Sequence, residues 1–142
     1  GTRLVAPVGL PPWPVGPSLA NAANMDPAVI RRALHTISSD LLGGVARQFQ
    51  RWILEGSFDG EDAFDYRAGM KNITAPLLLV AGEKDLLAPP ATVEPVRGWV
   101  SGPTDILRLA GYGHGDLSLG RRAPEEVFAP IAAFLERHAE AG

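Results

Sequence analysis

Residues 77–85 read Leu-Leu-Leu-Val-Ala-Gly-Glu-Lys-Asp, and they decide the fold that we expect for this chain. The run Pro76–Ala81 contains no polar residue, which is typical of a strand that is covered on both faces. Parallel strands of this kind are joined by crossover segments that are usually helical. Asp85 comes directly after the predicted strand, at the end where open α/β sheets place their ligands.

A second motif follows one predicted crossover later. Residues 104–110 alternate enough to form a strand, and residues 91–100 form a short helix that Pro95 interrupts. Residues 111–116 then read Gly-Tyr-Gly-His-Gly-Asp, so His114 lies in a glycine-rich loop after the second strand. Because the carboxyl ends of parallel strands share one edge of the sheet, we expect Asp85 and His114 to be neighbours.

The rest of the chain is predicted to be mainly helical. Residues 26–55 have apolar residues at helical spacing, with Asp26 as the N-cap, a break at Gly43-Gly44 and a stop at Gly56. A short helix is possible over 61–67. The last helix covers 124–139, where Pro130 kinks or splits it. The proline-rich residues 1–17 form an extended lead-in.

Composition narrows the classes of function. The net charge of −3 gives no reason to bind nucleic acid or an anionic membrane. No apolar run is long enough to span a membrane, and the given residues predict neither a signal peptide nor a phosphate-binding loop. The absence of cysteine excludes thiol catalysis, and three scattered histidines do not form a metal site. We expect no cofactor, and we take the cytoplasm as the default compartment.

His114 and Asp85 form a candidate base and acid. An imidazole titrates near neutral pH and accepts a proton readily, and a carboxylate on its other nitrogen fixes its orientation. The alternatives are a loop histidine that binds backbone carbonyls and an aspartate that forms a turn. Glu83 is the reserve candidate for the acid. Asp116 is expected to shape the loop or to cap a short helix.

These residues resemble the C-terminal half of the α/β-hydrolase family. Asn72–Pro76 resembles the lead-in to the acid-bearing strand, residues 77–85 the strand itself, residues 113–115 the histidine loop, and residues 124–138 the closing helix. The resemblance implies an α/β fold over 70–142, with two parallel core strands and flanking helices. It also implies a helical cap over 1–69, with Asp85 as the acid and His114 as the base of a catalytic triad.

The nucleophile of that family, a serine in Gly-x-Ser-x-Gly, is missing from the expected context. The nearest string, Gly16-Pro17-Ser18-Leu19-Ala20, follows no strand and ends in alanine. The remaining serines have no such context either: Ser38, Ser39, Ser57, Ser101 and Ser118. The aromatic and aliphatic group of Trp13, Phe49, Trp52 and Leu54 either lines an acyl pocket or packs in a core.

The resemblance therefore implies part of a serine hydrolase that acts on an ester, thioester or related acyl bond of a small molecule. The isolated chain is predicted to be inactive until the N-terminal half of the fold, or another copy of the chain, completes the sheet. An acyltransferase of the same fold is one alternative. A non-catalytic fragment that binds a partner or associates with itself is the other.

Overall fold

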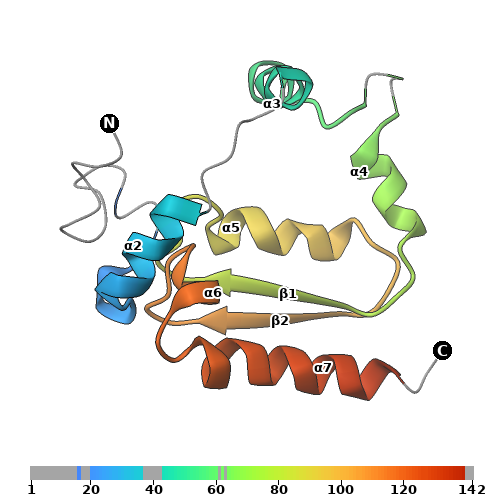
Figure 1. Ribbon diagram of the computed structural model, residues 1–142. Helices are drawn as coiled ribbons and strands as arrows, with labels where there is room; N and C mark the ends of the chain where they lie inside the picture. The colour runs from blue at the N-terminus through green and yellow to red at the C-terminus, as the bar shows by residue number, and fades with distance from the viewer. Residues whose placement is uncertain (1–15, 17–19, 37–42, 61, 63, 140–142) are drawn as a thin grey trace.

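Two parallel strands lie at the centre of the molecule in the computed structural model, which describes residues 16, 20–36, 43–60, 62 and 64–139 (Figure 1). Strand β1 is Leu77–Gly82 and strand β2 is Thr104–Leu109. They pair in parallel, with Leu77 opposite Thr104 and Gly82 opposite Leu109. The chain is thus a mixed α/β structure, and both predicted strands are confirmed.

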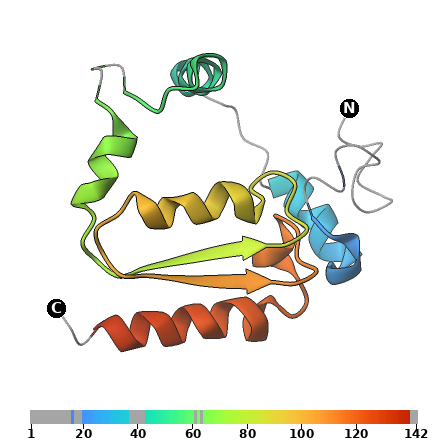
Figure 2. The same ribbon diagram turned by 180° about the vertical axis from the view of Figure 1, so that it is seen from behind.

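Helical segments flank the strand pair on two opposite sides (Figures 1 and 2). The crossover between the strands consists of helix α5 (Pro90–Val93) and a 3-10 turn (Glu94–Gly98), so Pro95 interrupts the helix as predicted. Helix α7 (Ala129–Ala139) lies on the other side. A parallel pair with a helical crossover is the arrangement that a continuous apolar strand predicts.

Two ion pairs show which side of the sheet each helical segment covers. Arg108 of β2 pairs with Glu94 in the crossover, whereas Asp105 of the same strand pairs with Arg137 of α7 at 3.5 Å. Successive side chains of a strand point to opposite faces, so residues 105 and 108 lie on different faces. The main core forms on the α7 face from Leu109, Tyr112, Ala123 and Val127, with Val80, Leu107, Leu117 and Ile131 packed against them.

The C-terminal helix begins with a π turn that comes directly before α7, whose first turn contains Pro130. Residues Pro124–Phe128 form this turn, and the Ala129 N–H donates to the Pro124 carbonyl five residues earlier. Pro130 has no N–H and cannot continue the ordinary hydrogen-bond ladder. The predicted kink is therefore accommodated as a wider turn inside one helix, as π turns often are.

The front part of the described chain is helical as predicted. Helix α2 (Pro27–Thr36) is capped by Asp26, whose Oδ1 accepts the Ala28 N–H at 2.7 Å. Helix α3 (Gly43–Glu55) ends at Gly56, which has a φ of 64°. The predicted break at Gly43-Gly44 is wrong in one respect, because both glycines belong to the first turn of α3. Residues 1–15 lie outside the described part.

A cluster of aromatic rings joins α3 to the next segment. The Trp52 ring lies 4.6 Å from Phe58 and 6.0 Å from Tyr66, and its Nε1–H donates to the Asp59 carbonyl at 2.7 Å. Tyr66 begins helix α4 (Tyr66–Gly69), which starts later than the predicted 61–67. Trp52 thus packs among aromatic side chains. A 3-10 turn, Met70–Asn72, follows α4.

None of the helices within the described residues combines the length and the apolar character that crossing a bilayer requires.

Candidate functional site

The structure brings Asp85 and His114 together where the two strands end. Asp85 lies just after β1 and His114 lies in the loop after β2. Their side chains meet with the His114 Nδ1 at 2.9 Å from the Asp85 Oδ2. The two residues are 29 positions apart in sequence, so it is the parallel pairing of their strands that makes them neighbours.

The second carboxylate oxygen of Asp85 is held by the turn that follows it. Oδ1 accepts the backbone N–H groups of Leu87 and Ala88, both at 2.8 Å. The residue is only 3% exposed. Asp85 therefore combines the two interpretations of its sequence context: it forms the turn with one oxygen and faces the imidazole with the other.

His114 presents one edge of its ring to Asp85 and leaves the other for chemistry. Its side chain is 50% exposed, in contrast to the buried carboxylate. Because an ionised carboxylate only accepts hydrogen bonds, the proton is assigned to Nδ1. Nε2 has no hydrogen-bond partner among the described residues, so it is the ring nitrogen with which a reacting group can exchange a proton.

Backbone hydrogen bonds tie the acid loop to the histidine loop. The Lys84 N–H donates to the Tyr112 carbonyl at 2.8 Å, and the Glu83 N–H donates to the Leu109 carbonyl at 3.1 Å. This approach requires glycine at position 82, because a Cβ there would lie 2.4 Å from the Tyr112 carbonyl oxygen. The distance between acid and base is thus set by backbone contacts as well as by side chains.

Burial and hydrogen bonding act in opposite directions on Asp85. Burial raises the pKa of its carboxyl, but the hydrogen bonds from Ala88, His114 and Leu87 outweigh burial, and the net pKa lies below 3.8. All three donors stabilise the ionised form. The acid of the pair is therefore a carboxylate at any pH near neutrality.

This lowered pKa predicts a loss of stability in acid. A carboxyl whose pKa is lower in the folded than in the unfolded chain stabilises the fold above the unfolded pKa, and the contribution disappears as the pH falls through the folded value. We expect the free energy of unfolding in urea to decrease below about pH 4. Asp85→Asn should flatten this decrease, and Glu136→Gln, at an exposed position of α7 that forms no ion pair among the described residues, is the control that should retain it. An equally steep decrease in Asp85→Asn would contradict the assignment.

Tyr112 anchors the histidine loop to the start of the C-terminal helix. Its hydroxyl donates to the Glu126 carboxylate, and its side chain is buried in the main core. Burial, together with the hydrogen bond to Glu126, raises the pKa of Tyr112 to about 12. The phenol therefore keeps its proton near neutral pH, so it can donate its hydrogen bond to Glu126 there.

Two residues that contact the loop, Asn21 and Asn24, were not among the candidates predicted from the sequence. The side chains of Asn21 and Asn24 donate to the Gly111 carbonyl at 2.6 and 3.0 Å, and Asn24 also donates to the buried carboxylate of Asp116 at 2.6 Å. They precede the loop by about 90 residues, and asparagine is common in turns, so no motif marks them. Asp116 shapes the loop, as expected.

The other candidates lie apart from the pair. Glu83 is exposed, so its carboxylate is not the one that faces His114. Ser57, Ser101 and Ser118 form no hydrogen bond with His114 in the described part of the chain, and Ser18, Ser38 and Ser39 lie outside it. Within the described residues, the structure thus joins Asp85 to His114 and shows no serine hydrogen-bonded to His114.

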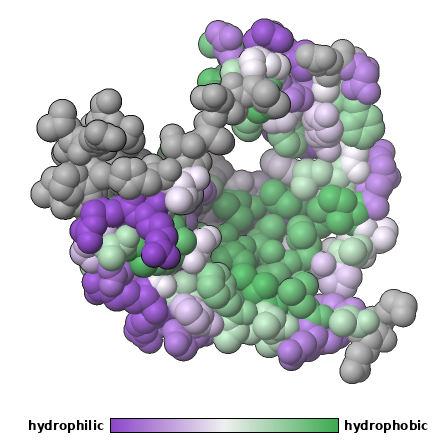
Figure 3. All heavy atoms as spheres, in the orientation of Figure 1, coloured by the Kyte–Doolittle hydropathy of each residue, from purple (hydrophilic) through white to green (hydrophobic). Residues whose placement is uncertain are grey.

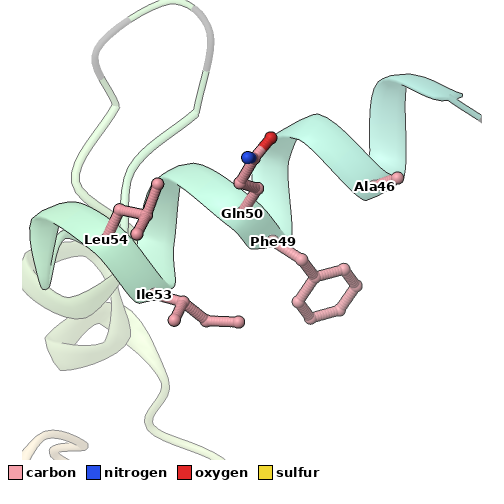
Figure 4. A pocket seen from close by; sticks show the side chains of 5 residues that line it. All are labelled: Ala46, Phe49, Gln50, Ile53 and Leu54. Atoms are coloured by element: carbon pink, nitrogen blue, oxygen red, sulfur yellow. The ribbon is translucent and has the colours of Figure 1, made fainter.

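A shallow pocket on α3 is separate from this site (Figure 4). It is lined by Ala46, Phe49, Gln50, Ile53 and Leu54, all from one helix. Ile53 and Leu54 are 78% and 75% exposed, so the pocket is an open helix face. Of the aromatic and aliphatic group singled out in the sequence, Trp52 belongs to the aromatic cluster, Phe49 and Leu54 line this face, and Trp13 lies outside the described residues.

Among the residues that the structure describes, no group of three or more histidine, aspartate or glutamate side chains is arranged to hold a metal ion.

Comparison of the chain with protein-family models, with curated proteins and with solved structures finds no match in any of the three. The assignment of a function therefore depends on the geometry of the site.

Proposed function

We propose that this chain supplies the acid and the base of a serine hydrolase related to the α/β-hydrolases, which cleaves an ester, a thioester or a related acyl bond. The observation that carries the proposal is the 2.9 Å contact between the His114 Nδ1 and the Asp85 Oδ2 at the shared carboxyl edge of two parallel strands. A buried carboxylate and a half-exposed imidazole in this order along the chain match the order of acid and base in that family.

In this proposal His114 moves the proton. Its Nε2 takes the proton from a serine hydroxyl as the hydroxyl attacks the acyl carbon, and it returns the proton to the departing alcohol or thiol. Asp85 accepts the hydrogen bond from Nδ1 throughout, which keeps Nε2 unprotonated in the resting state and stabilises the imidazolium after transfer. The exposure of His114 leaves room for the nucleophile and the substrate on the Nε2 side.

The serine comes, in this proposal, from a polypeptide that pairs with the sheet. The sheet of the described residues has two strands. The N–H groups of Leu77 and Glu83 point toward β2, where they donate to the carbonyls of Pro103 and Leu109. With the two-residue period of a strand, the N–H and C=O groups of Leu78 and Val80 face away from β2 and offer an edge to a further strand. Hydrophobic side chains also gather over the strands and α5 (Figure 3).

Reconstitution of activity tests this proposal. We expect the isolated chain to hydrolyse a short-chain p-nitrophenyl ester at the background rate, because no serine in the described part of the chain forms a hydrogen bond with His114. Addition of a polypeptide carrying the N-terminal half with a Gly-x-Ser-x-Gly motif should give turnover that depends on both the serine and His114. Turnover that survives His114→Ala would contradict the proposed role. A complex that forms and stays inactive would instead support a partner-binding fragment.

A further inference from the structure

A buried carboxylate next to the pair has no part in the acid–base chemistry. Asp116 is 0% exposed. Its Oδ1 accepts the backbone N–H groups of Asn21 and Gly113, both at 2.9 Å, and its Oδ2 accepts the Asn24 side-chain amide at 2.6 Å. A buried polar group is costly unless its hydrogen-bonding capacity is satisfied, and here both carboxyl oxygens of Asp116 accept hydrogen bonds.

The Asp116 carboxylate holds the backbone before His114, and a backbone hydrogen bond of the helix that Asp116 begins holds the backbone after it. Before the histidine, the Gly113 N–H lies 2.9 and 3.0 Å from the two oxygens of Asp116. After it, the Gly115 carbonyl accepts the Leu119 N–H at 2.9 Å in helix α6 (Asp116–Leu119), which Asp116 begins. His114 therefore lies between Gly113 and Gly115, and both of these glycines are hydrogen-bonded to residues of helix α6.

The segment 20–25 packs against the loop that carries His114 and forms hydrogen bonds with it. The two asparagine side chains donate to the Gly111 carbonyl, and the Asn24 carbonyl accepts the Arg121 N–H at 2.9 Å. The packing is tight, because a Cβ at Gly113 would lie 2.8 Å from the Asn21 nitrogen. Ala20, Met25 and Ile30 form a small core with Leu119 behind these contacts.

We propose that Asp116 is a positioning residue for His114. Together with Asn24 it fixes the loop so that Nδ1 stays on Asp85, and it makes this orientation depend on the segment 20–25. The catalytic consequence of this positioning rests on the proposed function, but the orientation of the His114 ring can be measured without any substrate. A purely structural role would stabilise the fold and leave the imidazole tautomer unchanged.

The test is the tautomer of His114, followed by NMR in protein labelled with ¹⁵N-histidine, at a pH where the ring is neutral. The wild type should show Nδ1–H as the main form, as the hydrogen bond to Asp85 requires. Asp116→Asn replaces one acceptor oxygen by a donor that faces other donors. We expect the ratio of Nδ1–H to Nε2–H to fall by about tenfold, the scale of one hydrogen bond to a charged group.

Two further variants make the result specific. Asp26→Asn makes the same chemical change at the cap of α2, outside the network, and should leave the tautomer ratio as in the wild type. The swap Asp116→Asn with Asn24→Asp restores a donor opposite an acceptor, and it should recover at least part of the ratio. If Asp116→Asn does not fold, Asn24→Ala replaces it, with a smaller shift in the same direction.

The outcomes separate the two proposals. A wild-type chain without the Nδ1–H form would contradict the pairing of His114 with Asp85, and with it the proposed function. A wild-type chain with that form, and an unchanged ratio in folded Asp116→Asn or Asn24→Ala, would overturn the positioning role alone.

Discussion

Replacing His114 with alanine is expected to lower the rate of ester hydrolysis by the reconstituted protein by about 10³- to 10⁴-fold. In the proposed mechanism, His114 takes the proton from the nucleophile and returns it to the leaving group, and this variant removes that group. Asp85→Asn should cost a similar factor, because an amide no longer enforces the tautomer with Nδ1–H. The measurement is the initial rate of p-nitrophenol release over a range of substrate concentrations, which separates kcat from KM.

His138→Ala is the matched control for this prediction. His138 lies in α7, where its ring packs 4.6 Å from Phe134, far in sequence from the loop. Its replacement should leave the rate within the scatter of the wild type. The effects of His114→Ala and Asp85→Asn should also be strongly non-additive, because the two side chains act as one unit. A double variant that loses the product of both factors would show that they act independently and would contradict the pairing.

Replacing Gly82 with alanine is expected to destabilise the fold and to disturb the site at once. The added Cβ would lie 2.4 Å from the Tyr112 carbonyl oxygen and 3.0 Å from its carbon. These are backbone atoms, which cannot move aside as a flexible side chain would. The loop after β2 must therefore shift away from β1, at a cost of about 1–3 kcal/mol in the free energy of unfolding.

The same change should also reduce the reconstituted activity. It increases the distance between the two loops that carry Asp85 and His114. Gly98→Ala is its control, because no atom lies within 4 Å of a Cβ at that position and its φ is not in the left-handed region. Urea unfolding measures the first effect and the ester assay the second. Equal stability of Gly82→Ala and Gly98→Ala would show that the backbone contact does not constrain the loops.

The strand pair and the acid–base contact could be predicted from the sequence for a simple physical reason. A run of six apolar residues has few alternatives to a strand covered on both faces, and parallel strands bring their carboxyl ends together. Those two facts place Asp85 beside His114 without any knowledge of the side chains in between. A separate local signal, a glycine after a stretch with helical spacing, located the end of α3 at Gly56, which has the positive φ that a helix stop favours.

The contacts of the loop could not be predicted in the same way. Asn21 and Asn24 reach the loop across a long sequence separation, and nothing in their own neighbourhood distinguishes them from ordinary turn residues. Burial of Asp116 is likewise a property of the assembled fold, because it needs donors from both segments. The start of α3 at Gly43 was mispredicted for a different reason. Glycine has a low helix propensity, so Gly43 and Gly44 predicted a break, yet both belong to the helix.

The hydrogen bond from Asn21 to Asp116 joins residues 95 positions apart, whereas His114 and Asp85 are 29 apart. Closing the longer loop costs about 1 kcal/mol more chain entropy. We therefore expect the strand pair to form before the front segment docks, and we expect the long-range contacts to open before the strand pair does. In this expected folding order, the contact between Asp85 and His114 forms early, and the proposed positioning contact of Asp116 with the front segment forms last and breaks first.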